Sequence, residues 1–225
     1  MKAAELVDAL ERVPRRQLGS YPTPLQRLDR LGRELGRPLW VKRDDQLGPA
    51  GGGNKTRKLE YLLADAMNAG AEKVVTVGGP QSNHARLTAA ASRLLGFEPH
   101  LLLFGAEPKQ AAGNLLIDQL LGAHLHFIPP GPIAAESCNF DELDEYVRAE
   151  ARERVGEHYY IPLGGSNGLG SLGYLRAALE IEVQAREAGI ERGWIVVATG
   201  SAGTLAGLLA GLQLSLIHIS EPTRH

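Results

Sequence analysis

The sequence contains only one cysteine, Cys138, among its 225 residues. A single thiol cannot form an internal disulfide, and it cannot build a cysteine-rich metal site. The chain also lacks any run of about 18 consecutive apolar residues, the length that a membrane-spanning helix needs. Its first residues contain no apolar core of the kind found in secretory signals. We therefore expect a cytoplasmic protein with no membrane partner.

An excess of charge of one sign is also missing. The formal net charge is −2, so the chain lacks the basic character of nucleic-acid-binding proteins. We expect no nucleic-acid partner. Apolar residues make up 44% of the chain and charged residues 22%, which are ordinary values for a globular protein. The length suits one large domain or two small ones.

Buried-type strands alternate with amphipathic helices along most of the chain. Strands are predicted at residues 39–43, 73–77, 99–104, 124–128, 159–163 and 194–198, and the intervening helices at 84–95, 111–121 and 141–154. This alternation predicts right-handed βαβ units and an α/β fold with a parallel sheet. Ligands of such sheets bind beyond the carboxyl ends of the strands. Four polar, glycine-rich loops lie there, at residues 48–55, 78–84, 164–170 and 199–204.

The first of these loops delivers a lysine, Lys55, to the start of a helix. The helix is predicted from an apolar stripe at Leu59, Leu62, Leu63 and Ala66. The positive end of a helix dipole disfavours a protonated amine. Lys55 is therefore a candidate for amine chemistry, and the alternative is a solvated lysine at a helix start.

The second loop ends in Ser82, Asn83 and His84, which precede a helix at the end of a buried strand. Asn83 has the groups to hydrogen-bond a ring oxygen, Ser82 to relay a proton, and His84 to do acid–base work near neutral pH. The alternative interpretation is that Ser82 and Asn83 cap the helix.

The last loop has the character of an anion-binding site. It contains Thr199, Gly200, Ser201, Ala202, Gly203 and Thr204. Glycines let the backbone approach a ligand, hydroxyl groups donate hydrogen bonds, and the following helix offers free N–H groups. The alternative is a tight turn between strand and helix. A nucleotide is not the expected guest, because the P-loop motif fails at Asn54 and the dinucleotide-binding glycine spacing is absent.

A lysine amine, a phosphate-binding loop and the lack of a metal cluster together favour pyridoxal phosphate as the cofactor. His124 and His126 share one face of a predicted strand, but no third ligand lies near them in the sequence. We therefore expect no metal site.

Four motifs in the same order are similar to those of one enzyme family. They are Gly52-Gly53-Asn54-Lys55-x-Arg57-Lys58-Leu59-Glu60, Gln81-Ser82-Asn83-His84-x-Arg86, Gly164-Gly165-Ser166-Asn167 and Gly200-Ser201-Ala202-Gly203-Thr204. The sequence resembles the D-cysteine desulfhydrase / 1-aminocyclopropane-1-carboxylate deaminase family of fold type II pyridoxal-phosphate enzymes. The resemblance implies a three-layer αβα parallel-sheet fold with two domains.

The resemblance also implies residue roles. Lys55 would hold the cofactor as a Schiff base and move protons once substrate displaces it. Asn83 would bond the cofactor's 3′-oxygen, and residues 199–204 would hold its phosphate. A small amino-acid substrate would lie against Ser82, Asn83, His84 and Gly165.

The order Ser-Asn-His and residues 161–167 resemble the desulfhydrase branch, whereas Leu205 departs from it. The implied reaction is α,β-elimination of D-cysteine to pyruvate, ammonia and sulfide. The alternatives are deamination of 1-aminocyclopropane-1-carboxylate, a sulfo-lyase reaction on cysteate, and an inactive truncated fragment that only binds the cofactor.

The resemblance divides the chain into segments. Residues 1–56 would begin the large domain, 57–160 would form the small domain, and 161–213 would resume the large domain. Residues 214–225 resemble a translated DNA sequencing adapter, so we expect an artefactual tail and an incomplete large domain. Relatives of this family are usually homo-oligomers, and we expect the same of the full-length form.

Overall fold

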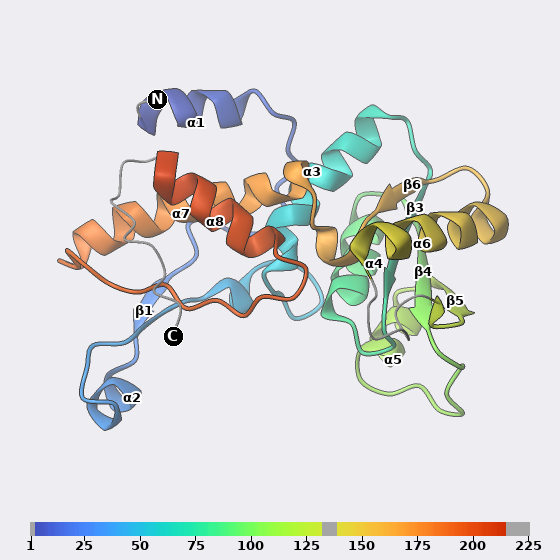
Figure 1. Ribbon diagram of the computed structural model, residues 1–225, viewed down its shortest axis with the longest axis horizontal. Coiled ribbons are helices and arrows are strands. Elements are labelled where there is room, and N and C mark those ends of the chain that lie inside the picture. The colour runs from blue at the N-terminus through green and yellow to red at the C-terminus, as the bar shows by residue number, and fades with distance from the viewer. Residues whose placement is uncertain (1–2, 132–138, 215–225) are drawn as a thin grey trace.

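The structure, a computed structural model, describes residues 3–131 and 139–214 (Figure 1). Cys138 and residues 215–225 of the expected tail lie outside the described residues. Among the residues that are described, no helix combines the length and the apolar character needed to cross a bilayer.

A four-stranded parallel sheet forms the centre of one half of the molecule. Its strands are β3 (Lys73–Gly78), β4 (Glu98–Phe104), β5 (His124–Ile128) and β6 (Tyr159–Ile161), in the spatial order β5-β4-β3-β6. Thr76 of β3 lies opposite Leu101 on one side and Ile161 on the other. The predicted parallel sheet is confirmed, although its last strand ends at Ile161 instead of Leu163. Pro162 follows, and its missing N–H cannot continue the ladder.

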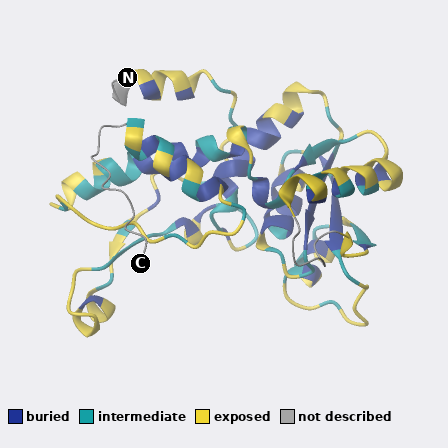
Figure 2. Ribbon diagram, viewed as in Figure 1, coloured by how far each residue is buried: buried dark blue, intermediate teal, exposed yellow. Residues whose placement is uncertain are grey.

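Helices cover both faces of this sheet. They are α3 (Lys55–Asn68), α4 (Asn83–Leu94) and α5 (Asn114–Leu120) on one face, and α6 (Phe140–Val155) on the other. Val74 packs with α3 and α4, whereas its neighbour Val75 packs with α6. Successive residues of a strand point to opposite faces, so a strand covered on both sides is apolar throughout. The two central strands, β3 and β4, are accordingly largely dark blue in Figure 2, and the three-layer αβα architecture is confirmed.

The other half of the molecule is mainly helical (Figure 1). It contains α1 (Ala3–Glu11), α2 (Asp29–Glu34), α7 (Gly168–Glu187), α8 (Gly203–Leu214) and the short antiparallel pair β1 (Leu25–Arg27) and β2 (Trp40–Lys42). The long helix α7 packs against both α3 and α8. A Cβ atom added to Gly173 would meet the main chain of Arg57, so glycine permits the close approach of α7 to α3.

One predicted strand is wrong. Residues 194–198 form no strand, and the side chains of Trp194 and Val196 are 79% and 95% exposed. A strand needs a neighbour for its main-chain N–H and C=O groups. Within residues 3–131 and 139–214, no strand pairs with this segment.

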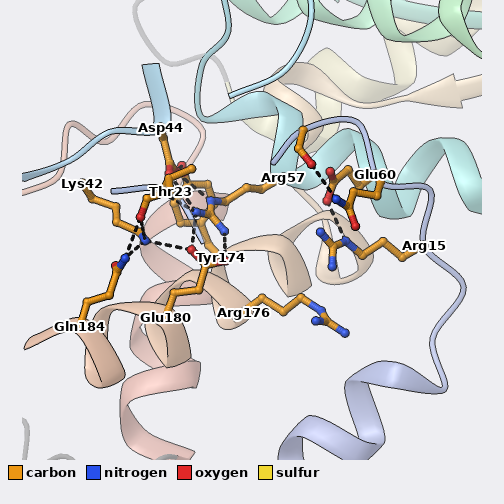
Figure 3. Close-up of polar contacts among 12 residues, drawn as sticks. Arg15, Thr23, Lys42, Asp44, Arg57, Glu60, Tyr174, Arg176, Glu180 and Gln184 are labelled. Carbon is orange, nitrogen blue, oxygen red and sulfur yellow. Dashed lines mark hydrogen bonds and ion pairs between the residues drawn. The ribbon is translucent and has the colours of Figure 1, made fainter. Parts of the chain in front are cut away.

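A buried group of charged side chains joins the N-terminal segment, α3 and α7 (Figure 3). The Arg57 side chain lies at its centre and is 2% exposed. Its Nε and Nη2 donate to Asp44 at 2.8 and 2.9 Å, and its Nη1 and Nη2 donate to Glu180 at 2.8 and 2.9 Å. Tyr174 donates to Asp44 at 2.6 Å, and Lys42 lies 2.9 Å from Glu180. Each charged side chain of this group therefore has an opposite charge beside it.

The charge balance of this group predicts a large loss of stability when its cation is removed. Arg57→Met would remove the two guanidinium hydrogen bonds to Asp44 and would leave its carboxylate buried without that cation. It would also remove the two guanidinium hydrogen bonds to Glu180. We expect the free energy of unfolding to fall by about 3–5 kcal/mol, measured by urea denaturation. Arg30→Met is the matched control, because the Arg30–Glu34 ion pair is exposed and should contribute little. Equal effects of the two substitutions would contradict the role of Arg57.

Candidate cofactor and active site

The loop before α3 is held in a shape that few side chains permit. Gly51, Gly52 and Gly53 have φ values of +84°, +68° and +138°. The N–H of Gly53 donates to the carbonyl of Leu47 at 3.1 Å, which closes the loop. The chain then enters α3 with Lys55 as its first residue.

The Lys55 side chain is half-buried at this helix start. Its Nζ donates to Oδ1 of Asn54 at 3.2 Å. Burial lowers the pKa of Lys55 below its ordinary value. The amide of Asn54 in turn donates to Oγ1 of Thr204 at 3.1 Å. The Asn54 side chain therefore forms a hydrogen-bonded bridge between the candidate lysine and the candidate anion-binding loop.

The loop at residues 199–204 presents hydroxyl groups close to a second lysine. Ser201 Oγ lies 2.7 Å from Ser166 Oγ. Lys58 Nζ donates to Ser166 Oγ at 2.9 Å and to the Gly164 carbonyl at 3.1 Å. A Cβ atom on Gly203 would lie 2.8 Å from Lys58 Nζ, so glycine keeps this space open.

An open hollow of about 460 Å³ borders this group of residues. It lies between the start of α7 and the start of α8, and its polar wall includes Ser166, Asn167, Ser171 and Ser201. The first turn of α8 begins at Gly203, and the first turn of any helix has N–H groups without partners inside the helix. Hydroxyl groups, a helix start and an amine are the donors that an anion needs.

His84 lies beneath these loops and is buried. Its Nε2 is 2.8 Å from Thr76 Oγ1, which itself donates to the carbonyl of Ile161 at 2.9 Å. The Thr76 hydroxyl therefore accepts from Nε2–H, and the unprotonated Nδ1 is a buried acceptor without a hydrogen-bond partner among the described residues. Burial, followed by the charges of Lys55 and Lys58, lowers the pKa of His84 to about 3.

The imidazole of His84 is consequently neutral across the physiological range. This burial argues against acid–base work by His84 near neutral pH, and its predicted catalytic role remains a prediction. A contact of His84 with substrate remains a prediction. Gly165, another predicted substrate neighbour, does lie beside it: a Cβ atom there would be 3.5 Å from the His84 ring.

Ser82 and Asn83 have structural partners in this state. Ser82 is the N-cap of α4, and its Oγ accepts from the N–H of Ala85 at 3.2 Å. The capping interpretation is therefore confirmed for Ser82. Asn83 is exposed, and its Oδ1 accepts from Nδ2 of Asn114 at 3.0 Å. The predicted roles of Ser82 in proton relay and of Asn83 in cofactor binding remain predictions.

The model of one protein family, described as "Pyridoxal-phosphate dependent enzyme", matches residues 16–223. The chain belongs to this family. Its cofactor is pyridoxal phosphate, as the lysine and the loop at residues 199–204 had indicated.

Individual relatives of this pyridoxal-phosphate enzyme carry two kinds of name. The chain is 46% identical to a putative 1-aminocyclopropane-1-carboxylate deaminase of Thermotoga maritima, over 90% of this chain and 62% of that protein. It is 44% identical to a D-cysteine desulfhydrase of Klebsiella pneumoniae, over 91% and 62%. A mitochondrial Arabidopsis thaliana protein named for both activities is 41% identical, over 89% of this chain and 51% of that protein. The chain thus spans about three-fifths or less of the length of these curated relatives.

A solved structure agrees with the sequence relatives. The crystal structure of an ACC deaminase homologue superposes with a TM-score of 0.76 and 38% sequence identity, covering 95% of this chain and 63% of that one. This likeness and the family match confirm the fold type II architecture.

The residues present fit pyridoxal phosphate. Lys55 supplies a half-buried amine. Hydrogen bonds through Asn54 connect this amine to the loop at residues 199–204, which carries hydroxyl groups and leads into the start of α8. A Cβ atom on Gly203 would fill the space between Lys58 and Ser166. The Nδ1 of His84, for which residues 3–131 and 139–214 offer no hydrogen-bond partner, adds a buried acceptor beside Gly165.

Lys58 is the site residue that sequence reasoning missed. Its side chain is buried, and burial together with the charge of Lys55 lowers its pKa to about 8. A signal was present, because Lys58 follows Lys55 by three residues and so shares its helix face. A charged residue within an apolar helix stripe also indicates a buried partner.

The lowered pKa of His84 predicts a dependence of stability on pH. In the unfolded chain a histidine has a pKa of about 6.5. Between pH 6.5 and 3 the unfolded state therefore binds more protons, and His84 makes the free energy of unfolding rise with pH in this window. His84→Gln should flatten that slope, measured by urea denaturation at a series of pH values.

The matched control is His158→Gln, which changes a histidine outside these loops. It shows how far the loss of a histidine elsewhere in the fold changes the slope, and the change in His84→Gln should be larger. A slope that is unchanged in His84→Gln would show that His84 is accessible to protons in the folded protein.

Proposed function

We propose that this protein is a pyridoxal-phosphate-dependent lyase that converts D-cysteine to pyruvate, ammonia and sulfide by α,β-elimination. The observation that carries the proposal is the half-buried amine of Lys55. Burial lowers the pKa of this amine, and hydrogen bonds through Asn54 connect it to the hydroxyl-rich loop at residues 199–204. The name of the Klebsiella pneumoniae relative supports the choice of substrate.

Lys55 is the residue to which we assign covalent attachment of the cofactor and transfer of the α-proton. Pyridoxal phosphate supplies the electron sink that makes that proton acidic. A neutral amine is needed to accept the proton, and burial favours the neutral form. When the carbon–sulfur bond breaks, sulfide leaves with the bonding electrons. The released enamine then hydrolyses to pyruvate and ammonia.

The other loops receive binding roles in this proposal. Ser201 and Thr204 would donate hydroxyl hydrogen bonds to the phosphate, together with main-chain N–H groups of residues 199–204. Ser82, Asn83 and Gly165 would border the substrate and the cofactor ring. His84 would act as a neutral acceptor, because its Nε2 is hydrogen-bonded to Thr76 and its Nδ1 has no partner within the part of the chain that the structure describes.

Deamination of 1-aminocyclopropane-1-carboxylate is the second candidate. It is favoured by the name of the Thermotoga maritima relative, which is 46% identical over 90% of this chain. Cleavage of cysteate to sulfite would use the same lysine with a different leaving group. A fragment that binds the cofactor without turnover is the remaining alternative, since the curated relatives are longer.

Attachment of the cofactor to Lys55 predicts a spectroscopic difference between two lysine variants. Lys55→Ala should lose the visible absorbance of lysine-bound pyridoxal phosphate, whereas Lys58→Ala should keep it. Borohydride reduction of the wild type, followed by peptide mass mapping, should place the reduced cofactor on Lys55. A label on Lys58 would overturn the assignment, and Lys58 is a stringent control because its amine belongs to the same site.

The substrate is tested by the product that each candidate would form. D-Cysteine should release sulfide and pyruvate, at a rate at least about tenfold above L-cysteine, because the α-proton of only one enantiomer faces the lysine. Release of 2-oxobutyrate from the cyclopropane amino acid alone, or of sulfite from cysteate alone, would replace the proposed substrate. Visible absorbance without any of these products would identify a binding fragment.

A further inference from the structure

Four side chains with metal-binding atoms gather at the amino ends of two strands. They are Glu98 and His100 of β4 and His124 and His126 of β5. His100 lies directly opposite His124 in the parallel register. Residues two apart on a strand share a face, so all four side chains lie on one face of the sheet, the face covered by α6. The candidate cofactor site lies at the opposite, carboxyl ends of the strands.

The ligand atoms of three of these residues converge. Oε1 of Glu98 is 3.1 Å from Nε2 of His100 and 3.0 Å from Nε2 of His124. The three atoms all lie within 4.8 Å of one another. Ligands of a tetrahedral zinc ion lie roughly 3.3 Å apart, since each metal–ligand bond is about 2.0–2.1 Å. The rings of His100 and His124 are stacked with centroids 4.5 Å apart, so binding of one ion by both Nε2 atoms requires the half-exposed His124 ring to turn toward Glu98.

His126 holds one of these ligands in place. Its Nε2 is 3.0 Å from Nδ1 of His100, and the two rings are stacked with centroids 5.3 Å apart. If His100 Nδ1–H donates to His126, Nε2 of His100 carries the free lone pair that a metal needs. Histidines that bind metals commonly donate their other ring N–H in this way, and the partner fixes the tautomer.

We propose that Glu98, His100 and His124 bind a divalent transition metal ion of the zinc class, which joins the edge strand β5 to β4. Two imidazoles and one carboxylate are ligands that zinc accepts, with the fourth position left to water. The site is open to solvent for that water, because the side chains of Glu98 and His124 are 41% and 51% exposed.

The surroundings are compatible with a bound cation. Arg154 of α6, the helix that covers this face of the sheet, is paired with Glu150 at 2.8 Å. The sequence showed only the pair His124 and His126. The register of β4 and β5 supplies Glu98 and His100 as the further ligands.

The proposal is tested by titrating Zn²⁺ into the purified protein without a polyhistidine tag and freed of unbound cofactor. Isothermal titration calorimetry should show one ion per chain, and Zn²⁺ should raise the melting temperature. Co²⁺ should give the ligand-field absorbance of a site with imidazole ligands. Glu98→Gln and His124→Ala should each weaken binding by more than ~100-fold, and His126→Ala by ~10-fold.

His158→Ala is the matched control, because it removes a histidine that lies outside the cluster. It should keep wild-type affinity. Melting curves without metal establish that each variant is folded, and His124 is suited to this because its side chain is half exposed. Absence of binding to the wild type, or affinity that is unchanged in both Glu98→Gln and His124→Ala, would overturn the proposal. Visible absorbance of the cofactor reports separately on Lys55, so failure here leaves the proposed function untouched.

Discussion

The ion pairs of Arg57 with Asp44 and Glu180 are the constraint on which the rest of the structure depends. The guanidinium binds both carboxylates with two hydrogen bonds each, in a place where water is excluded. Removal of one partner would leave an uncompensated buried charge, which costs far more than a surface ion pair. The pairs therefore fix where α3 begins relative to the N-terminal segment and to α7. Lys55 and Lys58 belong to that same helix, so the ion pairs also fix the two amines of the candidate site.

The parallel sheet and its covering helices could be predicted from the sequence, because the spacing of apolar residues that distinguishes strands from helices can be read within a short stretch of chain. The buried parts of β3 and β4 are mainly apolar, with Val74, Val75 and Val77 in β3 and Leu101, Leu102 and Leu103 in β4, and glycines mark the ends of the helices. The strand predicted at residues 194–198 shows the limit of this reasoning. Trp194 and Val196 have the residue types of a strand, but a strand exists only when another lies beside it. Pairing is a property of the fold and is not visible in a local window.

The candidate site could be predicted in part, for a similar reason. Glycine-rich loops before helices identified Lys55 and residues 199–204, and the structure brings them together through Asn54. The burial of His84 could not be predicted, because it results from packing between β3 and residues 164–165. The cluster of Glu98, His100 and His124 depends on which residues of β4 face those of β5. That register is set by packing across the whole sheet.

The hydroxyl pair of Ser166 and Ser201 has one further consequence. Ser166 Oγ accepts from Lys58 Nζ and lies 2.7 Å from Ser201 Oγ and 3.4 Å from the Gly164 carbonyl, so its one hydrogen can go to either neighbour. If Ser166 donates to Gly164, the Ser201 hydroxyl donates to Ser166 and leaves a lone pair of Ser201 facing the loop. If Ser166 donates to Ser201, the hydroxyl hydrogen of Ser201 is free for another acceptor. The pair can therefore offer either a hydrogen or a lone pair at Ser201 by rotation of two hydroxyl groups, with no movement of the main chain.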